Sequence, residues 1–358
     1  MAQQNFGNKL VGSIGKLLFG ILIFLASFVL LFMSEGRINY ATVAENAIHV
    51  DQALSNKDFV YVTSDLDTPT FLGDDLYLYE DEYLVVDRTV EMFSWVEEVE
   101  TEENEKVYYY DMKWVEDVPD SEEFREYRGH ENPAKAVSSN RFKVDEASVG
   151  IYKLDMDEIR LLGTKSLKLN EENLTLDGYQ EIISDENYDY VFDGYGSYDD
   201  PELGDIRIRY SVLEPVEEVT VFGRVADEKL GPHHGEKEKG LYRVFDGMKE
   251  DAQATLKGEY KAAGWFGRIG VFFLMWIGLM MMLSPLSVSM ELIPFLGQLG
   301  KGAISLIAFI VALVLTIVAS TMFAIFHSTL GLILMAGAVI LVAFYFYNKS
   351  QQKPAVKK

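Results

Sequence analysis

The sequence predicts a multi-pass α-helical membrane protein with four spans and a large extracytoplasmic, β-rich α+β domain between spans 1 and 2. Three apolar runs lie near the C-terminus, at 269–283, 304–325 and 330–347, and they contain no Asp, Glu, Lys or Arg. A fourth run near the N-terminus, at 14–33, contains only Lys16. A spanning helix needs about 20 mainly apolar residues to cross about 30 Å of hydrocarbon. The runs therefore favour membrane spans over buried helices of a soluble protein.

The first residues predict a short cytoplasmic N-terminus, 1–13, followed by transmembrane helix 1 at 14–33. Lys16 lies near the start of this run, where its side chain can snorkel to the headgroups. A cleaved signal peptide is the alternative, because a basic flank precedes an apolar core. The run is long for such a peptide and ends without a small-x-small cleavage pattern. We therefore expect an uncleaved anchor.

The C-terminal third predicts transmembrane helix 2 at 266–286, a cytoplasmic or interfacial loop at 287–303, and transmembrane helices 3 and 4 at 304–326 and 330–347. A basic cytoplasmic tail follows at 348–358. Lysines flank the first span and follow the last: Lys9, Lys16, Lys349, Lys353, Lys357 and Lys358. Short Lys-rich flanks stay in the cytosol, whereas a long acidic loop crosses largely regardless of its charge. Both termini are therefore expected in the cytosol and the long middle segment outside it.

The predicted extracytoplasmic domain, 34–265, is strongly acidic. Residues 36–265 hold 54 of the 56 acidic residues and 24 of the 32 basic ones, a local charge of −30, against −24 for the whole chain. Such a charge argues against nucleic-acid binding and favours cations or basic partners. The chain contains no cysteine, which excludes disulfides, thiolate catalysis and zinc–thiolate sites.

Alternating β-branched and aromatic residues predict that this domain is built mainly from strands. Segments 83–100 and 107–118 predict one long hairpin, and segments 205–212 and 218–225 predict a second around Pro215. Four further elements are expected: a strand at 59–63, short helices at 121–127 and 155–162, and a helix at 247–265 that runs into span 2.

Two groups of side chains are weak candidates for a metal site. His233 and His234 occupy a Gly/Pro-rich turn, where adjacent side chains diverge. Asp189 and Asp193 belong to an acidic, Gly-rich stretch at 185–205 whose oxygen donors suit calcium, but the stretch lacks the spacing of a recognised calcium loop. We predict no cofactor and no catalytic residue, because no Ser/His/Asp constellation can be argued from spacing.

The exit of the first span carries two charged residues, Glu35 and Arg37. A charge at this position is costly unless it is paired or reaches water. We expect both side chains to bond backbone or charged partners near Lys261 and Arg268, which would lock the first and second spans together. Contact with lipid headgroups by snorkelling is the alternative.

Five short motifs occur in order along the chain. They are Ser34-Glu35-Gly36-Arg37, Val90-Glu91-Met92-Phe93-Ser94-Trp95-Val96-Glu97, Gly129-His130-Glu131-Asn132-Pro133, Pro201-Glu202-Leu203-Gly204-Asp205-Ile206-Arg207 and Ala262-Ala263-Gly264-Trp265. With the order of one span, a large domain and three spans, they resemble the family of transmembrane protein 43, also called LUMA. The resemblance implies structural or junction roles for motif residues: Glu35, Gly36, Arg37, Trp95, His130, Asn132, Pro133, Gly204, Asp205, Gly264 and Trp265.

This resemblance implies a non-enzymatic integral membrane protein. Animal members of the family lie in the endoplasmic reticulum and inner nuclear membrane, self-associate, and bind lamins and emerin. A prokaryotic member would have no lamina. The expected location is therefore the bacterial inner membrane with a periplasmic domain if the chain is prokaryotic, or the endoplasmic reticulum and inner nuclear membrane with a lumenal domain if it is eukaryotic.

The leading hypothesis is a membrane scaffold that self-associates and organises membrane protein complexes through its extracytoplasmic domain. The expected partners are a second copy of the chain in a homo-oligomer, the lipid bilayer, and unidentified membrane or envelope proteins, with no nucleic acid. The alternative is an oligomeric channel or a lipid-handling membrane protein. Small residues at four-residue spacing in the predicted spans, such as Ala308 and Ala312, fit close helix packing within one chain or between chains.

Overall fold

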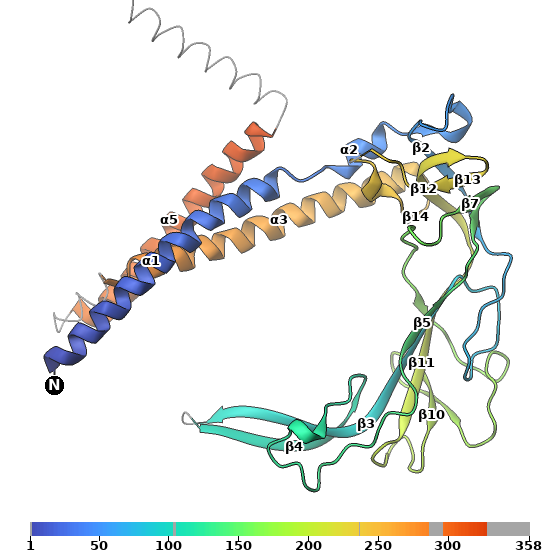
Figure 1. The fold of residues 1–358 in the computed structure, drawn as a ribbon, viewed down its shortest axis with the longest axis horizontal. Helices are drawn as coiled ribbons and strands as arrows, with labels where there is room; N and C mark the ends of the chain where they lie inside the picture. The colour runs from blue at the N-terminus through green and yellow to red at the C-terminus, as the bar shows by residue number, and fades with distance from the viewer. Residues whose placement is uncertain (1, 103–104, 236, 286–295, 328–358) are drawn as a thin grey trace, which may run out of the picture. The chain divides into compact units, whose positions relative to one another are not determined.

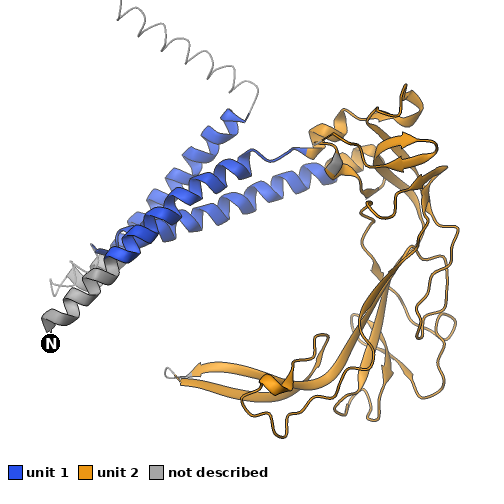
Figure 2. Cartoon of the chain, in the orientation of Figure 1, with its two compact units in different colours: residues 1–39, 255–358 blue, residues 40–254 orange. Residues whose placement is uncertain are grey.

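The computed structural model describes residues 2–102, 105–235, 237–285 and 296–327 (Figure 1). The chain forms two compact units, which Figure 2 distinguishes by colour. Residues 1–39 and 255–358 make up the helical unit, and residues 40–254 make up the β-rich unit.

The helical unit contains three long helices: α1 (Ala2–Glu35), α3 (Lys249–Met282), which begins in the β-rich unit, and α5 (Leu296–Phe326). Each is long and apolar enough to cross a membrane by length and composition. The predicted helix at 247–265 is confirmed, because α3 continues without a break to Met282.

Several predicted segments of the C-terminal third lie outside the described residues. They are transmembrane helix 4 at 330–347, the basic tail at 348–358 and residues 287–295 of the loop predicted at 287–303. The rest of that predicted loop is wrong, because α5 begins at Leu296. The structure therefore describes three candidate spans of the four that the sequence predicts.

The three helices pack through a small buried cluster. It contains Leu31 of α1, Val271 and Met275 of α3, and Ala312 and Ala319 of α5. The stripe of small residues on α5 is buried inside the unit: Ala308, Ala312, Thr316 and Ser320. Contacts within one chain therefore account for this stripe, and it is not free to hold a second copy.

The β-rich unit contains two sheets of seven strands each. The first sheet has the order β1 (Ile48–His49), β2 (Val60–Asp67), β6 (Ser148–Val149), β7 (Tyr152–Leu154), β13 (Lys229–Gly231), β12 (Val216–Ala226) and β14 (Val244–Asp246). Because β12 also pairs with β2, five of these strands close into a ring. The interior of the ring holds a core that includes Val62, Leu66, Val149, Val221 and Leu230.

The second sheet is built on β3. Its order is β4 (Glu105–Val115), β3 (Val85–Glu102), β11 (Ile206–Leu213), β10 (Asp189–Asp193) and β9 (Glu181–Ser184), with β5 (Asn140–Lys143) on β3 and β8 (Lys165–Ser166) on β11. Burial alternates along β11, where Ile206, Ile208, Tyr210 and Val212 face a second core. This period of two is the one expected of a strand with one covered face.

The remaining elements of the β-rich unit are short. They are α2 (Tyr40–Glu45) and three 3₁₀ turns, η1 (Val50–Gln52), η2 (Ser121–Glu123) and η3 (Lys239–Leu241). The predicted helix at 121–127 is therefore a single turn.

The long predicted hairpin is confirmed, because β3 and β4 pair in antiparallel register from Met92 opposite Val115 to Glu102 opposite Glu105. The second predicted hairpin is wrong. Strands β11 and β12 follow one another, but β11 pairs with β3 and β12 pairs with β2. The connection at Pro215 carries the chain from one sheet to the other, an outcome that alternation alone cannot distinguish from a hairpin.

The predicted helix at 155–162 is also wrong. This segment is a turn followed by an isolated bridge between Arg160 and Arg243. The Tyr242 hydroxyl accepts a hydrogen bond from the Asp155 N–H at 2.7 Å, and Ile159 is buried in the first core. Contacts with a distant part of the chain have overridden a weak local preference. Residues 60–63 of the strand predicted at 59–63 lie in the longer β2, which begins at Val60.

The two-residue turn between β12 and β13 has an unfavourable backbone. Asp227 and Glu228 have φ values of 51° and 61°, and they are the only non-glycine residues in the described chain with positive φ. A two-residue hairpin turn of this kind normally places glycine or asparagine at these positions. A left-handed conformation costs other residues about 1–2 kcal/mol.

We predict that Glu228→Gly raises the free energy of unfolding by about 1 kcal/mol, because glycine adopts the left-handed conformation without a steric cost. Thermal unfolding of the purified full chain measures this. Glu100→Gly on β3 is the matched control, since glycine inside an exposed strand should destabilise. A lower melting temperature for Glu228→Gly would contradict the prediction.

Candidate functional site

The helical unit contains an ion pair at the end of α1, between a buried carboxylate and a partly buried arginine. Arg268 donates from Nε and Nη2 to the two carboxylate oxygens of Glu35, at 2.7 and 3.0 Å. Glu35 is 6% exposed. A bidentate arginine–carboxylate pair fixes geometry as well as charge. The structure thus pairs Glu35 with Arg268, as expected from the sequence, and this pair joins α1 to α3.

Arg37 makes a second link between the same helices. Its Nη1 donates to the carbonyl of Ser34 at 2.5 Å, and its Nη2 donates to the carbonyl of Tyr260 at 2.8 Å. The guanidinium also lies over the Tyr260 ring, 4.1 Å from the centroid. A Cβ on Gly264 would collide with Nη2 of Arg37, so the glycine admits the arginine. Lys261 is exposed and is not part of this arrangement.

Gly36 and Trp265 lie next to the residues that make these two links. A Cβ on Gly36 would lie 2.5 Å from Nε2 of His327, whose ring is 4.4 Å from the ring of Phe32. Trp265 is 65% exposed and, with Arg268, borders an apolar groove of about 680 Å³ between α3 and α5. The groove is otherwise lined by apolar and small residues, including Phe272, Ile317, Ser320 and Ala324.

In the β-rich unit, Asn132 completes the edge of β3 beyond the end of β11. Its carbonyl oxygen accepts from the Trp95 N–H at 2.8 Å, and its amide nitrogen donates to the carbonyls of Trp95 and Pro119 at 3.0 and 3.2 Å. One side chain thus supplies both bonds that a neighbouring strand would supply. The loop that carries Asn132 is held in turn by the Ser121 hydroxyl, which accepts from the Asn132 N–H.

His130 packs within the same loop. Its ring stacks on Tyr110, 4.0 Å between centroids, and meets Trp95 edge-on at 4.7 Å. Its Nδ1 is 2.8 Å from the carbonyl of Glu126. The Tyr110 hydroxyl donates to Glu97 at 2.5 Å, and desolvation together with this carboxylate raises the pKa of Tyr110. His130 therefore holds a turn against the hairpin.

A break in the sheet lies on the opposite edge of β3. The partner β5 ends opposite Arg88 and the partner β4 ends opposite Met92, which leaves Val90 between them. The Val90 N–H donates to the Ser139 hydroxyl at 3.0 Å, and the Val90 carbonyl accepts from Nζ of Lys135 at 2.6 Å. Lys135 also donates to the carbonyl of Glu116 at 2.6 Å. Two side chains here replace a strand.

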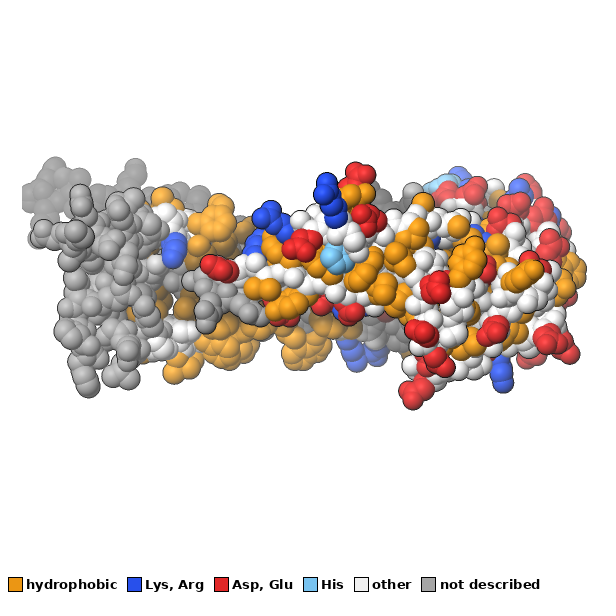
Figure 3. Space-filling model, turned by 90° about the horizontal axis from the view of Figure 1, so that it is seen from below, with side chains coloured by type: hydrophobic (Ala, Val, Ile, Leu, Met, Phe, Trp, Pro, Cys, Tyr) orange, Lys and Arg blue, Asp and Glu red, His pale blue; other side chains and the backbone are white. Residues whose placement is uncertain are grey.

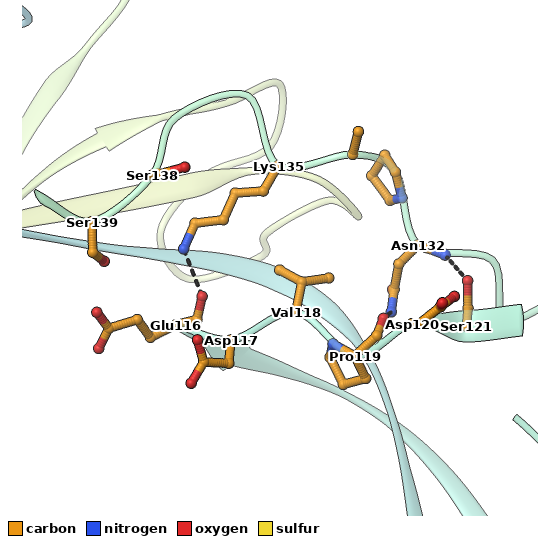
Figure 4. Close-up of a pocket in the computed structure, with 12 residues that line it drawn as sticks. Glu116, Asp117, Val118, Pro119, Asp120, Ser121, Asn132, Lys135, Ser138 and Ser139 are labelled. Carbon is orange, nitrogen blue, oxygen red and sulfur yellow. Dashed lines mark hydrogen bonds between the residues drawn. The ribbon is translucent and has the colours of Figure 1, made fainter. Parts of the chain in front are cut away.

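The break opens into a polar cavity of about 640 Å³, which Figure 4 shows. Lys135 and Ser139 border it on one side, and Glu116, Asp117 and Asp120 on the other. Burial lowers the pKa of the Lys135 ammonium. Sequence reasoning missed Lys135 and Ser139, because neither belongs to a periodic pattern or a recognised motif.

Asp205 organises the loop that precedes β11. It is 2% exposed, and its carboxylate accepts from the N–H groups of Tyr195, Gly196 and Glu202 at 2.8, 3.1 and 2.7 Å. Gly204 has φ +97°, and a Cβ there would lie 3.1 Å from Pro133. The acidic stretch at 185–205, a weak candidate for calcium, therefore ends on a carboxylate that already accepts three backbone N–H bonds.

The weak metal candidates are not brought together by the fold. Asp189 accepts from the Leu169 N–H at 3.0 Å, and Asp193 accepts from the Tyr77 hydroxyl at 2.6 Å. His233 contacts the carbonyl of Lys57 at 3.0 Å, and His234 borders a different cavity. Within the ranges that the structure describes, no group of three or more His, Cys, Asp or Glu side chains could hold a metal ion.

These arrangements have one chemical property in common. Glu35 bonds Arg268, while Arg37, Asn132 and Asp205 direct their hydrogen bonds to main-chain groups. Such bonds position elements of the chain.

Comparison with known proteins identifies relatives that match most of the chain. The family model described as Transmembrane protein 43 matches residues 92–329. The human protein named Transmembrane protein 43 is 27% identical over 383 residues, which covers 95% of this chain and 91% of the human one. The mouse protein of that name is 27% identical over 88% of this chain and 85% of its own.

A more distant relative comes from the fruit fly. The Drosophila melanogaster protein named Transmembrane protein 43 homolog is 25% identical over 72% of this chain and 74% of its own. No solved structure matches the chain.

We predict that Glu35→Ala lowers the free energy of unfolding in detergent by about 1–3 kcal/mol, because it leaves the partly buried Arg268 without its carboxylate. Melting of the purified chain measures the loss. Lys261→Ala, which removes an exposed charge about two turns before Arg268 on α3, is the control and should change little. An unchanged melting profile for Glu35→Ala would favour the headgroup interpretation.

We predict that Asn132→Ala destabilises the β-rich unit by about 1–3 kcal/mol, since it leaves buried backbone groups of Trp95 unpaired. The tryptophan emission spectrum should shift together with the melting temperature, because Trp95 loses its anchored environment. Asn187→Ala in an exposed loop is the matched control. Equal effects of the two substitutions would show that Asn132 has no anchoring role.

Proposed function

This chain belongs to the transmembrane protein 43 family, and on that premise we propose that it is a non-enzymatic membrane scaffold. In this proposal it self-associates and organises membrane or envelope protein complexes through its β-rich domain. The names of its relatives describe a membrane protein and no reaction.

The observation that carries the proposal is the structural role of the motif residues. Arg37 and Asn132 hold distant segments of the chain in place through backbone bonds, and Glu35 ties α1 to α3 through Arg268. These residues belong to the motifs by which the chain resembles the family, and together they support a stable three-dimensional frame. A frame of this kind suits a protein that acts by presenting surfaces to partners.

We further propose a four-span topology in which residues 330–347 form the last span. Both termini would then lie in the cytosol, because Lys-rich flanks stay there. The acidic domain would face the periplasm, or the lumen of the endoplasmic reticulum and nuclear envelope. Its partners there would be a second copy of the chain and other membrane or envelope proteins.

One observation favours a second candidate function, the handling of lipid. The groove between α3 and α5 is apolar along most of its length and has Arg268 and Trp265 in its lining. An acyl chain fits such a groove, and an arginine beside a tryptophan suits the headgroup level of a membrane. Nη1 of Arg268 is not used in the pair with Glu35.

We predict that the chain extracted with its native lipids has the mass of an oligomer, with laterally packed spans and no central opening. Native mass measurement and imaging of the lipid-embedded particles test this. A strictly monomeric particle would contradict the scaffold proposal. A ring of spans around a continuous opening would favour the channel instead, and a monomer that retains a bound lipid through purification would favour lipid handling.

The proposed topology has its own test. Protease added to the cytosolic side of sealed vesicles should leave the β-rich domain intact, and digestion of the domain from that side would contradict the topology.

A further inference from the structure

Strand β4 has one free edge. It is the terminal strand of the second sheet and pairs with β3 alone among the described strands. The other terminal strand, β9, has 4 residues, whereas β4 has 11. A long unpaired edge presents a row of N–H and C=O groups to which another extended chain can bind.

The register determines which residues of β4 direct their backbone N–H and C=O groups outward, away from β3. On β3, the backbone of Phe93 bonds on the β11 side, to Gly204 and Asp205, while the backbone of Val90 bonds on the opposite side. Successive residues of a strand address opposite edges. The backbone N–H and C=O groups of the even-numbered residues of β3 therefore point toward β4. Because Ser94 lies opposite Lys113, the backbone groups of the odd-numbered residues of β4 point toward β3.

The even-numbered residues of β4 consequently point their backbone groups away from the sheet. One observation agrees with this assignment: the Met112 N–H donates to the Asp111 side chain at 2.9 Å. The backbones of Tyr108, Tyr110 and Trp114 form the rest of this outer edge.

The surroundings of the edge are strongly acidic. Residues 97–120 contain ten acidic residues and two lysines, a net charge of −8. The acidic character continues into the cavity at the end of β4, where Glu116, Asp117 and Asp120 outnumber the one cation of the lining, Lys135 (Figure 4). On the face seen in Figure 3, acidic side chains also outnumber basic ones over the β-rich unit.

We propose that the outer edge of β4 binds an extended basic segment of a partner protein as an additional strand, with a Lys or Arg side chain of that segment entering the cavity at Glu116 and Asp117. Backbone bonds would supply the alignment, and the carboxylates would select the charge. A second copy of β4 is a poorer occupant, because two hairpins of charge −8 repel each other. This inference rests on the proposed scaffold function and gives it a class of partner.

The test uses the full chain in phosphatidylcholine nanodiscs, whose neutral lipid does not attract basic peptides. The probe is a nine-residue synthetic peptide that alternates Lys with Thr or Val, and its binding is measured by fluorescence anisotropy. A peptide with Glu in place of every Lys should not bind. Raising the salt from about 0.1 M to about 0.5 M should weaken binding severalfold.

Two substitutions at one position separate the backbone from the side chain. Tyr108→Pro removes an outward N–H that β3 does not use, and proline is tolerated there at an edge. It should weaken peptide binding about 5–10-fold, the value of one lost hydrogen bond. Tyr108→Thr keeps the N–H and should retain most of the affinity. Melting curves verify that both variants remain folded.

Charge is tested in the same way. Glu116→Gln with Asp117→Asn should weaken binding about threefold or more. The matched control, Glu181→Gln with Glu186→Gln beside the opposite edge of the sheet, should leave affinity unchanged.

Three results would overturn the proposal: equal binding of the acidic peptide, no difference between Tyr108→Pro and Tyr108→Thr, or self-association of the chain through β4 that the basic peptide does not displace. The mass of the lipid-embedded particle is measured alongside. An oligomer that fails to bind the peptide refutes the edge site and leaves the scaffold standing. A monomer that binds the peptide refutes self-association and supports the edge site.

Discussion

The architecture of the β-rich unit depends on the need to hydrogen-bond the backbone of β3 along both of its edges. Neighbouring strands satisfy most of that need, and side chains satisfy the rest. Asn132 takes over at Trp95, where β11 has ended, and Lys135 with Ser139 takes over at Val90, between β5 and β4. An unpaired buried backbone group costs about 1–3 kcal/mol, so these side chains are structural members of the sheet.

The helical unit solves a related problem with charge. Glu35 and Arg37 follow an apolar helix, where an unpaired charge is costly. The carboxylate of Glu35 is neutralised by Arg268. The guanidinium of Arg37 donates to two carbonyl groups and lies over the Tyr260 ring. Gly264 makes room for the second of these arrangements. Both links connect α1 to α3. The helices that precede and follow the β-rich unit in the sequence are therefore held together within the helical unit.

Local patterns in the sequence were sufficient to predict the features that depend on composition and period. These are the long apolar helices, the β3–β4 hairpin, the continuity of α3 and the region of α3, near Arg268, where Glu35 and Arg37 find partners. They were insufficient where partners come from far along the chain. The alternation at 205–225 predicts two strands. It does not reveal that the two strands, joined at Pro215, belong to different sheets. Lys135 and Ser139 carry no local signal, since their role exists only because two other strands stop short of Val90.

Successive residues of β3 bond to neighbours on opposite edges, and this alternation also limits how the length of the strand can change over evolution. Inserting or deleting one residue between Val90 and Trp95 would exchange the two edges for every residue beyond it and move the side chains of those residues to the opposite face of the sheet. The backbone of Trp95 would then address the β4 edge, and Asn132 would lose Trp95 as its partner. Gaps in alignments of related chains should therefore fall in the loops that surround this strand and not within it.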